Sequence, residues 1–96
     1  MYLVRDVFRT KPGKAKELVH KFKSAFKYLP KDGMGNSRIL TDVVADYWTV
    51  VLELEVETLM HFENMSGFTS KPQVQEIMQG YMDLVKEGHR EIFRIE

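Results

Sequence analysis

Apolar and polar positions alternate at the start of the chain. Residues 2–9 are rich in β-branched and aromatic side chains, and their alternation predicts a strand. One face of this strand carries Tyr2, Val4, Asp6 and Phe8, and the other carries Leu3, Arg5, Val7 and Arg9. Apolar residues then recur at helical spacing from residue 15 to residue 29, with Thr10 as the expected N-cap and Pro12 near the first turn. We therefore expect a strand followed by an amphipathic helix.

Two further strands are expected in the middle of the chain. The first covers residues 38–44 and the second covers residues 47–56. The second strand has one unbroken apolar face, made of Trp48, Val50, Leu52, Leu54 and Val56. Only Ala45-Asp46 lies between the strands, which predicts a tight antiparallel hairpin.

The last part of the chain predicts a broken helix and a fourth strand. Residues 58–65 form a short helix, Ser66-Gly67 interrupts it, and a longer helix starts near residue 70 and ends at Gly88 as its C′ residue. Residues 89–96 alternate again and predict the final strand. The order of elements is therefore β-α-β-β-α-β.

This order is that of the ferredoxin-like, or split βαβ, arrangement. We expect an α+β fold in which a single domain, residues 1–96, forms a four-stranded antiparallel sheet with two helices on one face. The other face lacks a cover and carries either the Leu3/Val7 series or the Val4/Phe8 series. Exposed apolar surface of this kind marks an interface, and two identical sheets packed face to face cover it most simply. A homodimer is therefore expected.

Charge and composition exclude several classes of function. Fourteen Lys and Arg residues balance fourteen Asp and Glu residues, which argues against a nucleic-acid partner. Basic residues concentrate in residues 1–38, which hold ten of them against three acidic residues. The chain has no cysteine, so disulfides, thiol redox chemistry and zinc–thiolate sites are excluded. No apolar run is long enough to span a bilayer, and we expect a cytoplasmic protein without a membrane partner.

Three segments resemble the dimeric α+β barrel superfamily. They are the opening strand that runs into Lys11–Ala15, the strand Trp48–Val56 that runs into a broken helix, and the ending Gly88–Phe93. This superfamily includes monooxygenases of the antibiotic-biosynthesis type, stress-responsive barrel proteins, haem-degrading enzymes and NIPSNAP-like proteins. The resemblance implies a dimer whose paired sheets form a barrel, with a pocket between each sheet and its helices.

The resemblance gives haem degradation little support. Haem-degrading members use an Asn on the first strand, a Trp on the broken helix and a His on the long helix. The matching positions of this chain hold Asp6, Phe62 and Met78. All three differ, and no cofactor is predicted.

Asp6 and His61 are the candidate catalytic residues. Asp6 shares a strand face with Val4 and Phe8, where a buried carboxylate without a partner is costly. It is either a pocket acid or base, or the ion-pair partner of an arginine such as Arg38. His61 is either a general base or a partly exposed residue of the short helix. Successive histidines are 41 and 28 residues apart, without the short spacing of a ligand pair, so no metal site is expected.

Trp48, Phe62, Met78 and Tyr81 are the candidate ligand-binding residues. Aromatic side chains at these positions suit a cavity for a planar ligand, and a methionine suits an adaptable wall. Core packing accounts for the same spacing, because aromatic side chains dominate protein cores. Both interpretations stay open at the level of sequence.

Three functions are compatible with these features. The first is a homodimer that binds a small apolar or aromatic molecule between sheet and helices. The second is a cofactor-independent monooxygenase of the antibiotic-biosynthesis type, in which Asp6 and His61 handle protons. The third is a structural dimer that recruits another protein without catalysis. A cavity that contains Asp6 favours the first function, whereas a filled core with Asp6 in a salt bridge favours the third.

Overall fold

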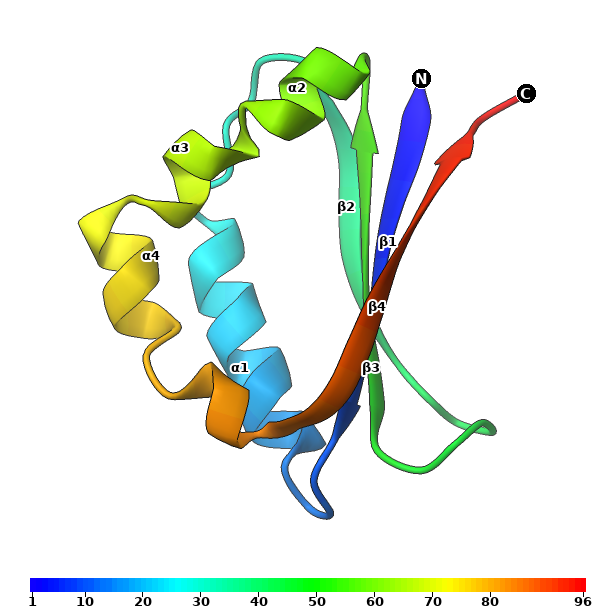
Figure 1. Cartoon of the computed structure of the whole chain (residues 1–96), viewed down its shortest axis with the longest axis vertical. Helices are drawn as coiled ribbons and strands as arrows, with labels where there is room; N and C mark the ends of the chain where they lie inside the picture. Colours follow the sequence, from blue (N-terminus) through cyan, green and yellow to red (C-terminus); the bar gives the residue numbers. More distant parts are fainter.

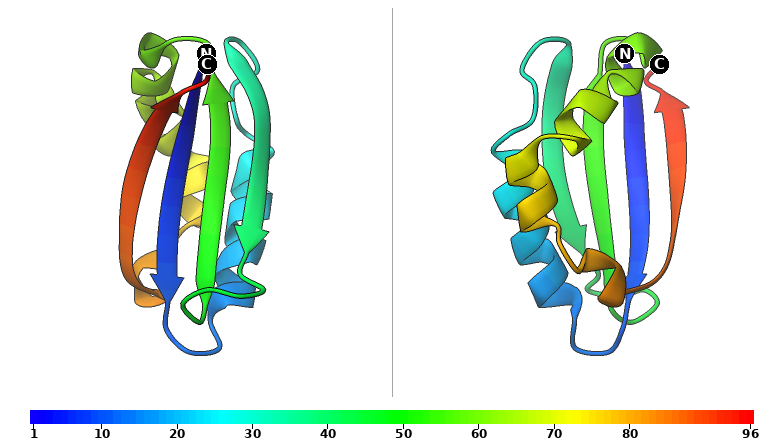
Figure 2. Two further views of the ribbon diagram at one scale, coloured as in Figure 1. Left: turned by 90° about the vertical axis from the view of Figure 1, so that its right-hand side faces the viewer. Right: turned by 60° about the vertical axis from the view of Figure 1, so that its left-hand side comes forward.

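One β-sheet and one layer of helices pack face to face in the computed structural model, which describes residues 1–96 (Figure 1). The elements in chain order are β1 Tyr2–Thr10, α1 Ala15–Phe26, β2 Met34–Thr41, β3 Thr49–Val56, α2 Leu59–Glu63, α3 Met65–Thr69, α4 Pro72–Ile77, the 3₁₀-helix η1 Tyr81–Asp83, and β4 Val85–Arg94. The four strands are ordered β2-β3-β1-β4, and each neighbouring pair is antiparallel (Figure 2). All helices cover the same face of the sheet, which confirms the expected ferredoxin-like α+β fold.

The register of β1 decides which side chains face the helices. β1 lies between β3 and β4, and its Asp6 stands opposite Leu52 on one side and Arg90 on the other. Phe8 packs against Phe22 of α1 with 5.3 Å between ring centroids. The Val4/Phe8 series therefore faces the helices, and the Leu3/Val7 series lies on the uncovered face.

The buried side chains form three small clusters, of which the first joins the two layers, the second lies in the sheet and the third lies in the helix layer. The first connects α1 to β3 and consists of Leu18, Phe22, Val50 and Leu84. The second connects β1 to β3 and consists of Val4, Leu54 and Val56. The third connects α1 to α3 and α4 and consists of Ala25, Phe68 and Val74. None of the helices has the length and apolar character that crossing a membrane requires.

The expected long second helix is wrong, because the segment is divided into α2, α3, α4 and η1. Ser66-Gly67, the expected interruption, lies inside α3, and the breaks fall at Asn64 and at residues 70–71. Beyond the end of α4, Gly80 takes a left-handed conformation with φ +81°, which turns the chain into η1. Residues 58–83 therefore form a strap of short segments.

The sequence predicts that Gly88 ends a helix, but the structure places Gly88 inside β4. This strand begins at Val85 rather than at His89. Gly88 stands opposite Phe8, and a Cβ atom at this position would approach the Phe8 Cδ1 atom to 3.1 Å. The glycine thus leaves room for the Phe8 ring.

The hairpin between β2 and β3 is longer than the expected two-residue turn. Residues 42–48 form a loop, in which Trp48 has a positive φ of 64° and leaves the alternation of β3. Thr10 does not cap the first helix, which begins only at Ala15. Its backbone N–H instead donates to the Trp48 carbonyl at 2.8 Å and ties the loop to β1.

Candidate ligand-binding cavity

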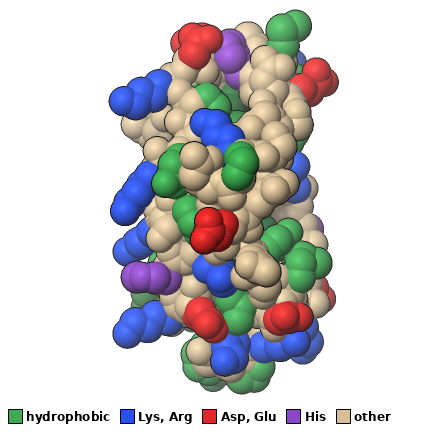
Figure 3. Space-filling view, turned by 90° about the vertical axis from the view of Figure 1, so that its left-hand side faces the viewer, with side chains coloured by type: hydrophobic (Ala, Val, Ile, Leu, Met, Phe, Trp, Pro, Cys, Tyr) green, Lys and Arg blue, Asp and Glu red, His purple; other side chains and the backbone are tan.

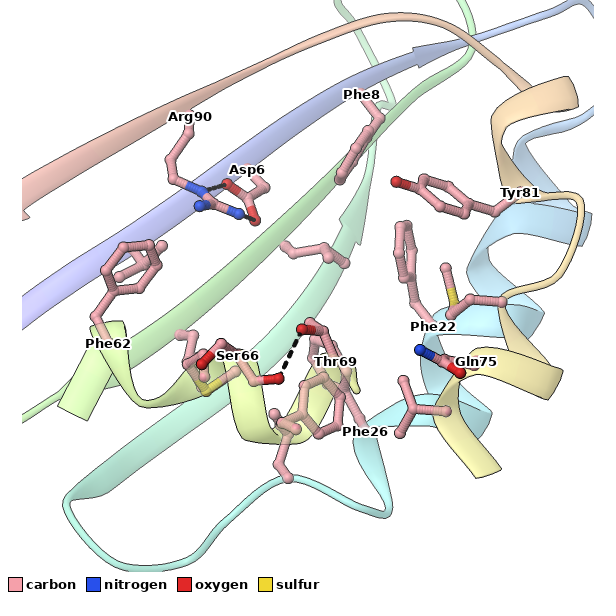
Figure 4. A pocket seen from close by; sticks show the side chains of 18 of the residues that line it. Asp6, Phe8, Phe22, Phe26, Phe62, Ser66, Thr69, Gln75, Tyr81 and Arg90 are labelled. Carbon is pink, nitrogen blue, oxygen red and sulfur yellow. Dashed lines mark hydrogen bonds and ion pairs between the residues drawn. The ribbon is translucent and has the colours of Figure 1, made fainter. Parts of the chain in front are cut away.

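An open cavity of about 650 Å³ lies between the sheet and the helix layer (Figure 4). Most of its wall is apolar, and the aromatic part consists of Phe8, Phe22, Phe26, Phe62, Phe68 and Tyr81. The polar part consists of Asp6, Glu63, Ser66, Thr69, Gln75 and Arg90. This volume lies within the range of small-molecule sites, which is roughly 300–1,000 Å³.

Asp6 and Arg90 form the one ion pair among the residues that line this cavity. They stand opposite each other on β1 and β4, so both side chains project from the helix-facing side of the sheet. Arg90 Nε donates to Asp6 Oδ1 at 2.6 Å, and Arg90 Nη2 donates to Asp6 Oδ2 at 3.1 Å. This contact raises the pKa of Arg90, although partial burial acts in the opposite direction.

The pair reaches from the interior to the rim of the cavity. The Asp6 side chain is 18% exposed and the Arg90 side chain is 54% exposed, because β4 is an edge strand. The expected alternative partner, Arg38, lies on β2 and bonds Glu53 on the uncovered face instead. Asp6 is therefore an ion-paired carboxylate in an apolar cavity.

Phe62 also contacts the Arg90 guanidinium (Figure 4). The Cζ atom of Arg90 lies 5.0 Å from the Phe62 ring centroid, within the range of a cation–π contact. Phe62 belongs to α2, in which Thr58 caps the first turn by accepting from the His61 backbone N–H at 3.2 Å. Arg90 thus connects β1, β4 and α2 at one end of the cavity.

His61 does not line the cavity. Its Nδ1 atom lies 2.8 Å from Thr58 Oγ1, and its ring covers Gly33, where any Cβ atom would overlap the imidazole. The structure therefore does not bring His61 and Asp6 together in one site.

Trp48 also lies outside the cavity, whereas the other predicted ligand-binding residues line it. Trp48 belongs to the loop 42–48, where its positive φ breaks the alternation that placed it on the apolar face of β3. Phe62, Met78 and Tyr81 line the cavity from α2, from the turn after α4 and from η1. The Tyr81 hydroxyl points into the cavity on the side of Phe8 (Figure 4).

Arg90 is the charged residue of the cavity that the sequence analysis did not single out. Alternation along the last strand places Arg90 and Ile92 on one face, which is a signal that one cation joins an apolar surface. Its partner could not be inferred, because Asp6 and Arg90 are 84 residues apart and their pairing depends on the register of β1 and β4.

The basic residues of α1 lie on the outer surface of the helix layer. Figure 3 shows Lys and Arg side chains along the side of the molecule that α1 occupies. Lys21 has a structural contact, because its Nζ atom donates to the carbonyl of Ile77, the last residue of α4, at 3.2 Å and to that of Gln79, just after α4, at 3.0 Å. This contact fixes α4, which carries part of the cavity wall, to α1.

The sheet, the segmented strap and the cavity between them are arranged as a ferredoxin-like α+β fold. No family model matches the chain, and no curated protein sequence matches it. Solved structures, in contrast, include many chains with the same fold as this protein.

Three of these structures show how far the similarity of fold extends. A NIPSNAP-like domain protein from Burkholderia xenovorans superposes with a TM-score of 0.82, over 99% of this chain and 84% of that one, at 14% identity. A protein from Nitrosomonas europaea, provisionally assigned as an antibiotic biosynthesis monooxygenase, superposes with a TM-score of 0.78. The superposition covers 99% of this chain and 98% of that one, at 14% sequence identity. A conserved protein from Methanosarcina mazei superposes with a TM-score of 0.76, over 99% of this chain and 92% of that one, at 16% sequence identity. These similarities confirm the resemblance at the level of fold.

Proposed function

We propose that this protein binds a small, mainly apolar or aromatic molecule in the cavity between sheet and helices. The cavity of about 650 Å³, lined mainly by apolar side chains and holding one charged pair, supports this proposal. Sites of this size and lining bury most of a small ligand and orient it with a few polar groups. A filled core, which would have favoured a purely structural dimer, is not what the two layers enclose.

Naphthalene is a suitable first probe, because it is flat, apolar and uncharged. Two-dimensional NMR spectra recorded during a titration with naphthalene should show shifts of the amide resonances of residues that line the cavity. Met78→Trp fills the cavity and should weaken binding at least tenfold. Met82→Trp is the matched control, because Met82 is 66% exposed on η1. Shifts confined to the uncovered sheet face, or equal affinity in both variants, would contradict the proposal.

We propose that a second copy of the chain covers the opposite sheet face. Leu40, Phe93 and Ile95 are all at least 36% exposed, and the loop residues Val43 and Val44 are almost fully exposed. Most charged side chains of this face, with Glu55 as the exception, are already paired within the chain, so a second copy meets a surface with largely compensated charge. Sedimentation equilibrium should give twice the chain mass of 11.3 kDa at micromolar concentration. A stable 11.3 kDa species would overturn the dimer.

A second candidate function is cofactor-independent oxygenation of the bound ligand. Asp6 lies in an apolar cavity where it can accept a proton from a phenol, and the neighbour from Nitrosomonas europaea carries a monooxygenase assignment. A suitable reaction is 1-naphthol with O₂ to 1,4-naphthoquinone and water, in which the naphthol supplies all the electrons. Consumption of O₂ that requires the folded protein, and that Asp6→Asn abolishes, would support this function. A rate equal to that of the buffer alone would exclude it for this substrate.

A further inference from the structure

The Asp6–Arg90 pair has hydrogen-bonding capacity that its own contact does not use. A guanidinium has five N–H groups, and Arg90 spends one on Nε and one on Nη2. Three N–H groups therefore remain, two of them on Nη1. The Asp6 carboxylate has about four lone-pair directions and likewise uses two of them for Arg90. The pair thus retains strong donors and strong acceptors side by side.

The charges around this pair disfavour an ionic ligand. Asp6 and Arg90 neutralise each other, and the other ionisable carboxylate of the cavity is Glu63, on α2 next to Phe62. Glu63 takes part in none of the ion pairs of the chain. An anionic ligand would meet this additional negative charge, and a cationic ligand would meet the Arg90 guanidinium.

We infer that the Asp6–Arg90 pair recognises a neutral hydroxyl group on the ligand, which donates to Asp6 and accepts from Arg90. A hydroxyl group is both donor and acceptor, so one such group satisfies both halves of the pair. The apolar remainder of the ligand then lies along the aromatic wall, beginning at Phe62, whose ring is held beside Arg90. This inference rests on the proposed ligand-binding function and adds the chemical class of the ligand.

The remaining polar groups of the cavity do not offer the same combination. Tyr81, Gln75 and Ser66 are uncharged, and hydrogen bonds to ionised groups are roughly twice as strong as bonds between neutral groups. Thr69 already donates its hydroxyl to the Ser66 carbonyl at 3.1 Å. The charged pair is therefore the dominant site for a polar group of the ligand.

A series of naphthalenes that share one ring system tests the inference by calorimetry or NMR titration. The series consists of naphthalene, 2-methoxynaphthalene, 2-naphthol, 2-naphthalenemethanol and 2-naphthoate. We expect one of the two hydroxyl compounds to bind about tenfold more tightly than 2-methoxynaphthalene, the ratio for losing one hydrogen bond to a charged group. The methoxy compound accepts but cannot donate, so this comparison isolates the bond to Asp6. The two hydroxyl compounds distinguish a phenol from an alcohol.

The double variant Asp6→Leu/Arg90→Leu assigns the preference to the pair. An apolar replacement of both partners of a partly buried ion pair is usually tolerated, and naphthalene should still bind. In this double variant, the ratio of the affinity for the hydroxyl compound to the affinity for 2-methoxynaphthalene should fall to about one. The matched control is Arg9→Gln/Glu87→Gln, which removes another ion pair between β1 and β4 on the opposite face of the sheet and should keep the preference.

The outcomes separate this inference from the function on which it rests. If naphthalene binds the cavity but neither hydroxyl compound exceeds 2-methoxynaphthalene, hydroxyl recognition is wrong and cavity binding stands. Tightest binding of 2-naphthoate, or a preference that survives in the double variant, also overturns the inference. If no compound of the series binds to the folded protein, both the inference and the proposed cavity function fail.

Discussion

The two faces of the sheet arrange charge differently, although both use cross-strand neighbours of β1. The uncovered face carries three linked ion pairs, Arg38–Glu53 at 2.5 Å, Arg5–Glu53 at 3.6 Å and Arg5–Glu91 at 3.6 Å, and one separate pair, Arg9–Glu87 at 2.8 Å. The helix-facing side carries one isolated pair, Asp6–Arg90, among apolar and aromatic side chains. Pairing across strands therefore occurs on both faces, and only the surroundings differ.

These surroundings change what an ion pair does. On the uncovered face, Arg5 and Glu53 each have a second partner, so a lost contact is partly replaced. The separate pair Arg9–Glu87 is exposed on both sides, and exposed pairs contribute little to stability. On the helix-facing side, Asp6 depends on Arg90 alone. Asp6–Arg90, which lines the cavity, is therefore the pair that the proposed ligand recognition uses.

The largest difference between the two faces is expected at adjacent valines of β3. Val50 is fully buried in the cluster with Leu18, whereas Val51 lies on the uncovered face and is 7% exposed. Val50→Ala should lower the free energy of unfolding by about 2 kcal/mol and Val51→Ala by about 1 kcal/mol, because only the first leaves a cavity in the core. Urea unfolding measures both. Equal losses would show that the two faces are packed equally well.

An intermediate difference is expected for two arginines that bridge β1 and β4. Arg90→Ala leaves Asp6 unpaired in an apolar site and should lower the free energy of unfolding by about 1–2 kcal/mol. Arg9→Ala breaks the exposed pair with Glu87 and should lower it by about 0.5 kcal/mol or less. Adding Asp6→Leu to Arg90→Ala should restore most of the loss, since it removes the unpaired carboxylate. Absence of this recovery would mean that packing of the arginine, not its charge, stabilises the site.

The smallest expected effect concerns pH. The pKa of Arg90 is raised in the folded protein by its bond to Asp6, so the charged form is favoured. Its contribution to stability is therefore fully present below the unfolded-state pKa of arginine and is lost only as the pH rises through the raised value. Between pH 6 and pH 9, the difference in unfolding free energy between wild type and Arg90→Ala should stay constant within about 0.5 kcal/mol. A decline toward pH 9 would contradict a charged Arg90.

Alternation was a reliable guide wherever one face of a strand is buried. It predicted β1, the apolar run of β3 and the position of Asp6 on one face with Val4 and Phe8, because a period of two places every second side chain on the same side of the sheet. Which face the helices cover was left open by the sequence. Alternation failed at Trp48, where a positive φ ends the alternation, and at Gly88, where a residue typical of helix ends serves to admit the Phe8 ring. Both residues contact β1, which lies far away in the chain: Trp48 contacts Thr10, and Gly88 stands opposite Phe8.

The amino-acid sequence by itself determined the order of elements and hence the class of fold, because helical and strand periods are local properties of the chain. It also determined that Asp6, Phe62, Met78 and Tyr81 are candidates for one site. Tertiary structure decided the rest: the division of the second helix into short segments, the exclusion of His61 and Trp48 from the cavity, and the partnership of Asp6 with Arg90. These features depend on register and packing between segments as much as 84 residues apart, which no local pattern encodes.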